Sequence, residues 1–260
     1  MLSDTDRAHF EERGYLRVPS AFTMGEAEAM RDVVWHALQR QGFRRDDPST
    51  WANEAPSHLQ SLKADDVFKA IGSDRTLAAI DDVVGAGRWT LPSDWGAYFL
   101  LFPTRRVWTV PWKGWHLDHD YAGPLSPVEG LKVHSLFGDV APQAGGMTIV
   151  AGSHHIVARH FADHPPPPGA RAAQLRTLLM HSNDYLRELG TDGEPGPRIA
   201  RFFERDEEVL GVPLRVVELT AEAGDVILIH PLVLHTRPTN AGTQPRFLLN
   251  KDLYLKSRSA

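Results

Sequence analysis

The sequence is most informative over residues 224–235, which read Gly224-Asp225-Val226-Ile227-Leu228-Ile229-His230-Pro231-Leu232-Val233-Leu234-His235. The Gly-Asp pair favours a turn, and the four branched apolar residues after it predict a short strand that is buried on both faces. A histidine follows at the far end of the segment. The stretch therefore predicts a β structure with an imidazole near the rim of a buried strand.

Strand-like runs dominate the chain after residue 87, and helical patterns dominate before it. The predicted strands cover residues 15–18, 96–102, 106–110, 131–140, 147–150, 214–219, 226–229 and 246–255. The predicted helices cover residues 5–13, 23–40, 65–71 and 73–84, with Thr5 and Thr23 as N-caps. Strands and helices do not alternate as βαβ units, so their order predicts an all-β core that carries a helical layer.

A single domain accounts for the length and composition. The chain has 260 residues, of which 42% are hydrophobic and 23% charged, as is ordinary for a globular protein. We expect a helical N-terminal layer at residues 1–88, a β core at residues 89–255 and an insertion at residues 161–212. The insertion carries four prolines at 165–168, which favour polyproline II, and a predicted helix at 170–189. Its role is open between a surface loop and a lid over one mouth of the core.

The composition excludes several classes of protein. There is no cysteine, so disulfides, zinc fingers and thiolate nucleophiles are excluded, and any metal must be held by His, Asp and Glu. A net charge of -5 argues against a nucleic-acid partner. No stretch approaches the ~20 apolar residues that span a membrane, and the first residues are too polar for a secretory signal. We therefore expect a cytoplasmic protein that acts on a small molecule.

A second stretch, Trp115-His116-Leu117-Asp118, adds a pair of candidate metal ligands. Alternate residues of a strand share one face, so His116 and Asp118 point the same way. An imidazole and a carboxylate are two parts of the 2-His-1-carboxylate triad of non-haem Fe(II) oxygenases, and His235 would complete it. The H-x-D pattern alone occurs by chance in many chains, and polar residues at strand ends are the alternative interpretation.

Arg246 follows eleven residues after His235 and opens the last apolar strand. A guanidinium holds a carboxylate through two charge-assisted hydrogen bonds. A metal site beside a carboxylate anchor is what 2-oxoglutarate requires, because its keto acid end chelates iron and its distal carboxylate must be held. A surface ion pair is the alternative interpretation of Arg246.

Further segments accompany these residues in a fixed order along the chain. Gly146 stands before a predicted strand, Gly152-Ser153-His154 forms a turn at the exit of that strand, and residues 10–15 read F-x-x-x-G-Y. Taken with the H-x-D, Gly-Asp…His and Arg246 segments, they resemble the phytanoyl-CoA dioxygenase family of Fe(II)/2-oxoglutarate oxygenases. The resemblance covers residues 10–249. Each motif is modest alone, but four motifs in order at the family spacing are specific.

The resemblance implies a fold, a reaction and a set of ligands. The fold is a double-stranded β-helix, a cupin-like jelly roll with the N-terminal helices packed on one sheet. Fe(II) is held by His116, Asp118 and His235, while 2-oxoglutarate and O2 take the open positions. The co-substrate is converted to succinate and CO2, and an unactivated carbon of a small molecule, in secondary metabolism, is hydroxylated or otherwise oxidised.

Other residues are candidates for contacts with these ligands. The candidates for 2-oxoglutarate, besides Arg246, are His134 and Thr148, which are otherwise core polar side chains with satisfied hydrogen bonds. The candidates for the substrate pocket are Trp108, Trp112, Asp120 and Arg237. Core packing is the alternative for the two tryptophans, and a solvated loop is the alternative for Asp120.

Two other classes of protein stay open at this point. One is a cupin-type metalloenzyme that does not use 2-oxoglutarate and would have no need of Arg246. The other is a non-catalytic ligand-binding protein that keeps the fold without turnover, although a complete triad argues against decay of the site. Asp118 favours hydroxylation over halogenation, because the related halogenases carry Gly or Ala in place of that carboxylate. The sequence leaves the oligomeric state open.

Overall fold

Two antiparallel sheets form the core of the protein in a computed structural model that describes residues 1–118, 128, 130–166 and 172–255. The strands are β1 (Tyr15–Val18), β2 (Ala97–Tyr98), β3 (Gly130–Leu136), β4 (Thr148–Ala151), β5 (Glu207–Val209), β6 (Val212–Glu218), β7 (Val226–Ile229), β8 (His235–Thr236) and β9 (Leu248–Tyr254). One sheet has the order β1-β7-β3-β9-β2 and the other β5-β6-β4-β8. This arrangement confirms the predicted mainly β, jelly-roll fold.

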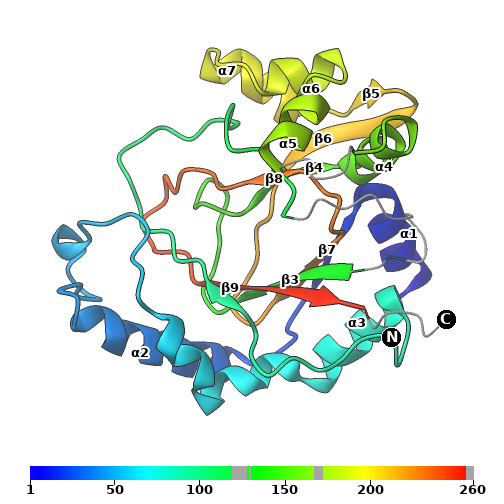
Figure 1. The fold of residues 1–260 in the computed structure, drawn as a ribbon. Helices are drawn as coiled ribbons and strands as arrows, with labels where there is room; N and C mark the ends of the chain where they lie inside the picture. The colour runs from blue at the N-terminus through cyan, green and yellow to red at the C-terminus, as the bar shows by residue number, and fades with distance from the viewer. Residues whose placement is uncertain (119–127, 129, 167–171, 256–260) are drawn as a thin grey trace.

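Helices cover the outer face of each sheet, so the molecule has four layers (Figure 1). The α-helices are α1 (Asp4–Arg13), α2 (Met24–Gln39), α3 (Asp74–Val84), α4 (Ser153–Asp163), α5 (Ala172–Met180), α6 (Asp184–Leu189) and α7 (Pro195–Arg198). Shorter helical turns are η1 (Pro48–Thr50), η2 (Gln60–Ala64), η3 (Asp66–Gly72) and η4 (Ile199–Phe203). Helices α2 and α3 lie under the five-stranded sheet, and α4 to α7 lie on the side of the four-stranded sheet. None of the described helices combines the length and the apolar character needed to cross a bilayer.

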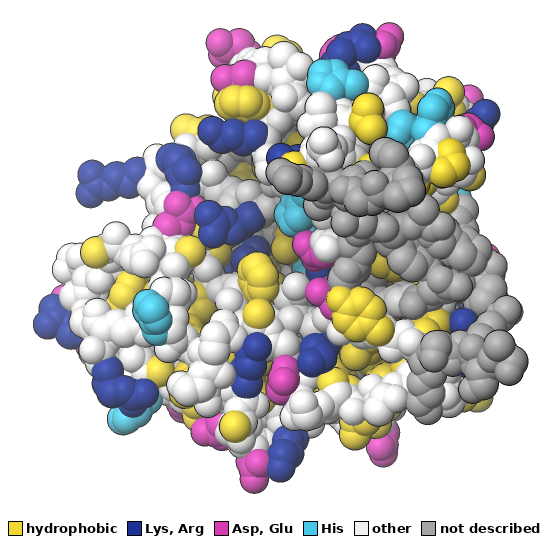
Figure 2. All heavy atoms as spheres, in the orientation of Figure 1, with side chains coloured by type: hydrophobic (Ala, Val, Ile, Leu, Met, Phe, Trp, Pro, Cys, Tyr) yellow, Lys and Arg dark blue, Asp and Glu magenta, His cyan; other side chains and the backbone are white. Residues whose placement is uncertain are grey.

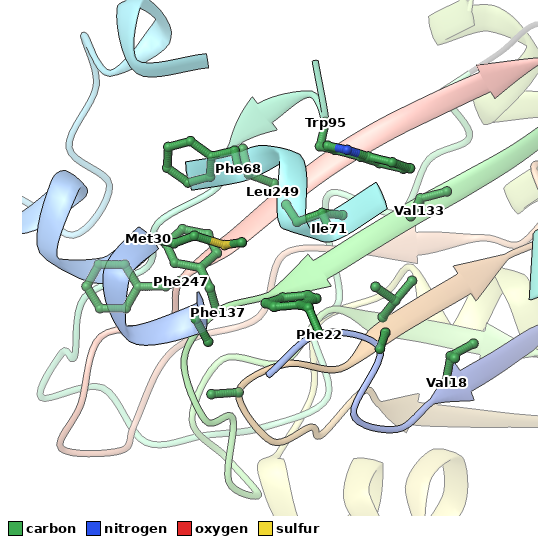
Figure 3. Close-up of a cluster of buried hydrophobic side chains, with 14 of the residues drawn as sticks. Val18, Phe22, Met30, Phe68, Ile71, Trp95, Val133, Phe137, Phe247 and Leu249 are labelled. Atoms are coloured by element: carbon green, nitrogen blue, oxygen red, sulfur yellow. The ribbon is translucent and has the colours of Figure 1, made fainter. Parts of the chain in front are cut away.

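Strand alternation divides β3 between two environments. Leu131 and Val133 belong to the large hydrophobic cluster that contains Met30 of α2 and Ile71 of η3 (Figure 3). Lys132 and His134, which alternate with them, point to the opposite face, toward the second sheet. Leu136, at the end of the strand, belongs to a separate cluster between the sheets. Leu131 and Val133 therefore pack on the helical side of the sheet, whereas two polar side chains, Lys132 and His134, enter the space between the sheets.

The described part of the predicted insertion forms a hydrophobic layer on the four-stranded sheet. Leu179 of α5 and Leu186 of α6 are fully buried in a cluster with Leu214 and Val216 of β6. Arg198 fastens this layer: its guanidinium donates five hydrogen bonds, all to backbone carbonyls of residues 110–111 and 188–191. Closure of this segment over the site stays a prediction.

Helices α1 and α2 each begin directly after a residue whose side chain caps the helix, and one of the two predicted N-caps is wrong. Thr23 accepts from the backbone N–H of Glu26 at 3.2 Å and completes a capping box, as predicted. At α1 the cap is Ser3 rather than Thr5: the hydroxyl of Ser3 accepts from the N–H of Asp6 at 3.1 Å, and the N–H of Ser3 donates to the carboxylate of Asp6 at 3.0 Å. The helix therefore begins at Asp4, and Thr5 lies inside its first turn.

Other predicted elements need correction. The strand predicted at 106–110 is wrong: these residues join no ladder, and Trp108 and Val110 are buried by packing rather than by pairing. The helix predicted at 65–71 is a 3₁₀ turn, η3. The helix predicted at 170–189 is two helices, because Asn183 caps a new one through a 2.9 Å bond from the N–H of Leu186. Helix α4 was not expected, since the sequence around Ser153 predicted only a turn.

Candidate metal centre

The two candidate histidines are paired through their backbones. The N–H of His116 donates to the carbonyl of His235 at 3.0 Å, and the N–H of His235 donates back at 3.2 Å. This isolated bridge lies at the end of the four-stranded sheet, where β8 pairs with β4. The bridge holds the two imidazole rings with their centroids 4.4 Å apart.

Each imidazole is oriented by a hydrogen bond to a carbonyl two residues earlier. Nδ1 of His116 lies 2.7 Å from the carbonyl of Gly114, and Nδ1 of His235 lies 3.0 Å from the carbonyl of Val233. A carbonyl oxygen only accepts, so Nδ1 is the protonated nitrogen in both rings. The lone pair of each Nε2 is therefore free for a metal, in the arrangement by which ligand histidines are usually fixed.

Asp118 brings its carboxylate between the two imidazoles. Its Oδ1 lies 3.3 Å from Nε2 of His116, and its Oδ2 lies 3.3 Å from Nε2 of His235. The three side chains thus present ligand atoms that all lie within 4.8 Å of one another. Burial alone would raise the pKa of Asp118, but its close contacts with both imidazoles and the charge of Lys132 outweigh burial and lower it. The carboxylate is therefore ionised and ready to bind a cation.

Lys132 is a site residue that the sequence analysis missed. Its side chain is buried, and its ammonium contacts Oδ2 of Asp118 directly. It also donates to Oδ1 of Asp252 at 2.8 Å and approaches Oδ1 of Asn250 at 3.5 Å. A lysine between Leu131 and Val133 in a buried strand is itself a signal, because an ammonium is rarely buried without a partner.

Arg246 is buried on the inner side of the same sheet without a carboxylate partner among the described residues. Its Nη1 donates to the carbonyl of Gly145 at 2.5 Å and its Nη2 to that of Phe99 at 3.3 Å, while Nε has no hydrogen-bond partner. Burial, followed by the charge of Arg237, lowers the pKa of Arg246 to about 10. The guanidinium is thus a positive charge in an apolar setting, with a free donor.

A glycine turn beside Arg246 explains the paired glycines of the sequence. Gly145 has φ +82°, and a Cβ on Gly146 would lie 2.5 Å from the carbonyl oxygen of Leu219. The buried carboxylate of Glu218 accepts from the N–H groups of Gln143, Gly145 and Gly146 at 2.7, 3.2 and 3.0 Å. Burial raises the pKa of Glu218, and these backbone bonds oppose the rise. The turn is thereby held in place to receive Arg246.

His134 and Thr148, the other predicted 2-oxoglutarate contacts, are both buried. Neither ring nitrogen of His134 has a hydrogen-bond partner. Burial, together with the charges of Lys132 and Arg246, places its pKa well below the usual value, so the ring is neutral. Thr148 pairs with Thr236 across β4 and β8, and its hydroxyl lies 3.5 Å from the carbonyl of Gly146.

The candidates for the substrate pocket are less closely grouped. Trp108 is buried and packs edge-on against Phe203 of η4, with ring centroids 5.0 Å apart. Trp112 is 37% exposed, and the ammonium of Lys113 lies 4.8 Å above its ring. Arg237 is exposed, and Asp120 lies outside the described residues. Their contacts with a substrate stay predictions.

The surface around the site is mixed in charge. Figure 2 shows histidine and acidic side chains side by side near the middle of this face, with several Lys and Arg side chains to their left. Lys113 and Arg237 are exposed on the two segments that carry His116 and His235. The carbonyl of Lys113 accepts from the hydroxyl of Thr236 at 3.2 Å, which holds these two segments together.

The Gly-Ser-His motif has a supporting role away from the candidate ligands. The hydroxyl of Ser153 accepts from the N–H of Leu234, directly before His235, at 2.9 Å. Nε2 of His154 lies 2.9 Å from the carbonyl of Glu11, and burial lowers the pKa of His154 to about 4. The motif therefore ties the end of α1 to the segment that delivers His235.

Comparisons with known proteins agree with this architecture. The phytanoyl-CoA dioxygenase (PhyH) family model matches residues 10–248, so the chain belongs to that family. No curated protein matches the sequence.

Three solved structures share the fold. HygX from Streptomyces hygroscopicus, with nickel and 2-oxoglutarate bound, is 18% identical with a TM-score of 0.54, over 98% of this chain and 87% of that chain. AviO1 from Streptomyces viridochromogenes Tue57 is 16% identical with a TM-score of 0.54, over 100% and 98% of the two chains. The non-heme alpha ketoglutarate dependent epimerase SnoN from nogalamycin biosynthesis is 17% identical with a TM-score of 0.52, over 99% and 86%.

Proposed function

We propose that this protein is an Fe(II)- and 2-oxoglutarate-dependent oxygenase that oxidises a small molecule. His116, Asp118 and His235 hold the iron, and Arg246 anchors the distal carboxylate of 2-oxoglutarate. The observation that carries the proposal is the convergence of two Nε2 atoms and an ionised carboxylate within 4.8 Å, in a protein that also buries the guanidinium of Arg246. Such a set leaves one side of the metal open for a chelating co-substrate and O2.

The three candidate ligands fit a catalytic iron site better than a structural zinc site. Both histidines bind through Nε2, with Nδ1 tied to a carbonyl, and the single carboxylate supplies the charge. Structural zinc sites are closed by four protein ligands, whereas only three converge among the residues that the structure describes. When bound, the iron supplies the activation of O2 that is coupled to the conversion of 2-oxoglutarate to succinate and CO2.

Arg246 and its surroundings fit the distal end of 2-oxoglutarate. A buried guanidinium without a carboxylate is unfavourable unless an anion completes it, since burying an unpaired charge is costly. A dicarboxylate held by Arg246 can reach toward the metal past His134, which is neutral and has two unpartnered ring nitrogens. Thr148 lies beside the Gly145–Gly146 turn that receives Arg246. Arg246 and His134 therefore form the centre of the proposed co-substrate site.

Hydroxylation of a carbon is the reaction that we propose, because the carboxylate ligand is present. SnoN, which shares the fold, is described as an epimerase, and HygX has been crystallised with hygromycin B. These neighbours bind or transform small natural products, and we propose a substrate of that size from secondary metabolism. A metalloenzyme that does not use 2-oxoglutarate is the second candidate, but it leaves the buried charge of Arg246 without a purpose.

Thermal unfolding of the metal-free protein tests the proposal. A ligand that binds only the native state raises the unfolding temperature. We expect 2-oxoglutarate to raise it only when Mn(II) or Co(II) is present. Glutarate, which lacks the chelating keto group, and 2-oxobutyrate, which lacks the distal carboxylate, are the matched controls and should give much smaller shifts. Equal shifts with 2-oxobutyrate and 2-oxoglutarate would contradict the role of Arg246, and no shift with metal alone would contradict the metal centre.

A further inference from the structure

We infer that Lys132 is a positioning residue that fixes the carboxylate of Asp118 for metal binding, and that Asp252 holds Lys132 in place for this task. The inference rests on the proposed function, because it concerns the same metal centre. It goes beyond the ligand set by assigning roles to two charged side chains that bind neither the metal nor the co-substrate.

Asp118 is the one candidate ligand that lacks support from the sheet. The two histidines are held by a reciprocal backbone bridge and by bonds from Nδ1 to carbonyls. Asp118 lies in a bend outside any strand, two residues beyond that bridge. Its carboxylate can rotate about two side-chain torsions unless another group fixes it. Among the residues that the structure describes, Lys132 contacts this carboxylate through its ammonium group.

Lys132 is itself fixed by the register of the five-stranded sheet. It lies directly opposite Asp252 in the β3–β9 ladder, and opposite residues share a face. An ammonium has three donors, and three acceptors surround this one: the carboxylate of Asp118, that of Asp252 at 2.8 Å and the amide oxygen of Asn250 at 3.5 Å. Each of the three donors of Lys132 thus has an acceptor, and the residue is only 4% exposed. The side chain therefore acts as a rigid support.

Two explanations of Lys132 predict opposite effects on metal binding. If the ammonium acted only as a positive charge near the metal, its removal would strengthen the binding of a divalent cation. If it positions Asp118, its removal frees the carboxylate and weakens binding. Groups that orient metal ligands typically change metal affinity 10–100-fold when they are removed. The sign of the change therefore distinguishes positioning from simple electrostatics.

The experiment is a titration of the metal-free protein with Co(II) alone, followed by calorimetry and visible absorption. We compare the wild type with Lys132→Met, which removes the ammonium and keeps an apolar stem. The matched control is Lys251→Met, on the neighbouring position of β9, where the lysine pairs with Asp94 at 3.4 Å on the opposite face. A second test variant, Asp252→Asn, removes the charge that holds Lys132 and keeps the side-chain shape.

We expect Lys132→Met to weaken Co(II) binding roughly 10–100-fold and to alter the Co(II) absorption at saturating metal. Asp252→Asn should shift both readouts in the same direction by a smaller factor, and Lys251→Met should leave both unchanged. Thermal unfolding verifies that each variant is folded. If Lys132→Met does not fold, the Co(II) affinity and spectrum of Asp252→Asn test the positioning role instead. Unchanged or tighter binding with an unaltered spectrum, in a folded test variant, would overturn the inference while leaving the metal centre intact. Absence of Co(II) binding by the wild type would contradict the metal centre and the role of Lys132 together.

Discussion

The backbones of His116 and His235 exchange two hydrogen bonds, of 3.0 and 3.2 Å, although the residues are 119 positions apart in the sequence. The pairing places both imidazoles at one end of the four-stranded sheet. The pairing also explains why His235 follows strand β7 by several residues. The chain has to cross from the five-stranded sheet, which contains β7, to the four-stranded sheet, which contains β8, before it reaches position 235.

Asp118→Ala should abolish iron-dependent turnover, because two imidazoles hold Fe(II) weakly. We expect at least about a 100-fold loss in the uncoupled conversion of 2-oxoglutarate to succinate, measured with Fe(II) in air. Asp66→Ala, which removes an exposed carboxylate paired with Lys69, is the control and should retain full activity. Full activity of Asp118→Ala would show that the ligand assignment is wrong.

Arg246→Met should raise the concentration of 2-oxoglutarate required for half-maximal turnover by about 100-fold or more, because a buried anion loses its charged partner. Co(II) affinity should change little, since Arg246 is not a ligand. Arg237→Met is the control: Arg237 is exposed, so its removal should change the requirement only a few-fold. A large effect of Arg237→Met with none from Arg246→Met would move the anchor to Arg237.

The buried His154 predicts a loss of stability in acid. Its pKa is lowered to about 4 by burial, whereas an exposed histidine titrates at 6.5. Between these values the unfolded chain binds more protons than the native one, so the free energy of unfolding decreases as the pH falls from 6.5 to 4, by about 3 kcal/mol.

Denaturant unfolding at pH 7 and pH 4.5 measures this contribution. His154→Gln keeps a donor for the carbonyl of Glu11 but cannot be protonated, so it should lose less stability on acidification than the wild type. His181→Gln, at an exposed position, should behave as the wild type does. Equal acid sensitivity of His154→Gln and the wild type would contradict the assignment.

Arg198→Met should destabilise the protein strongly, because five backbone carbonyls lose their donor at once. We expect a decrease of about 3 kcal/mol or more in the free energy of unfolding. Arg187→Met removes an exposed ion pair with Asp184 and should cost less than about 1 kcal/mol. Chemical denaturation of both variants measures the difference. Similar stabilities for the two would show that Arg198 does not fasten the helical layer.

Local patterns in the sequence predict the part of the site that depends on neighbouring residues. The H-x-D spacing places His116 and Asp118 on one side of the chain, and the Gly-Asp turn before a buried strand predicts β7 at its observed bounds. Lys132 was missed because its role depends on which strands are neighbours. Its partners, Asp118 and Asp252, lie 14 and 120 residues away in the sequence.

The false strand at 106–110 has a related cause. Trp108 and Val110 are more buried than the residues on either side of them, as in a half-buried strand, but no strand in the described part of the chain pairs with them. They are buried because the helical layer packs on them, with Phe203 against Trp108 and Arg198 bonded to the carbonyl of Val110. An alternating pattern of apolar residues indicates which side chains are buried. Only the tertiary structure shows whether that burial comes from a hydrogen-bonded strand.

An anaerobic titration of the metal-free protein with Fe(II) and then 2-oxoglutarate, followed by visible absorption, tests the central claim most directly. Chelation of iron by the keto acid gives a weak metal-to-ligand charge-transfer band. We predict that this band appears with the wild type, is absent from Asp118→Ala, and requires far more 2-oxoglutarate with Arg246→Met. If Fe(II) binds to the wild type and no band develops at saturating 2-oxoglutarate, the protein is not a 2-oxoglutarate-dependent oxygenase.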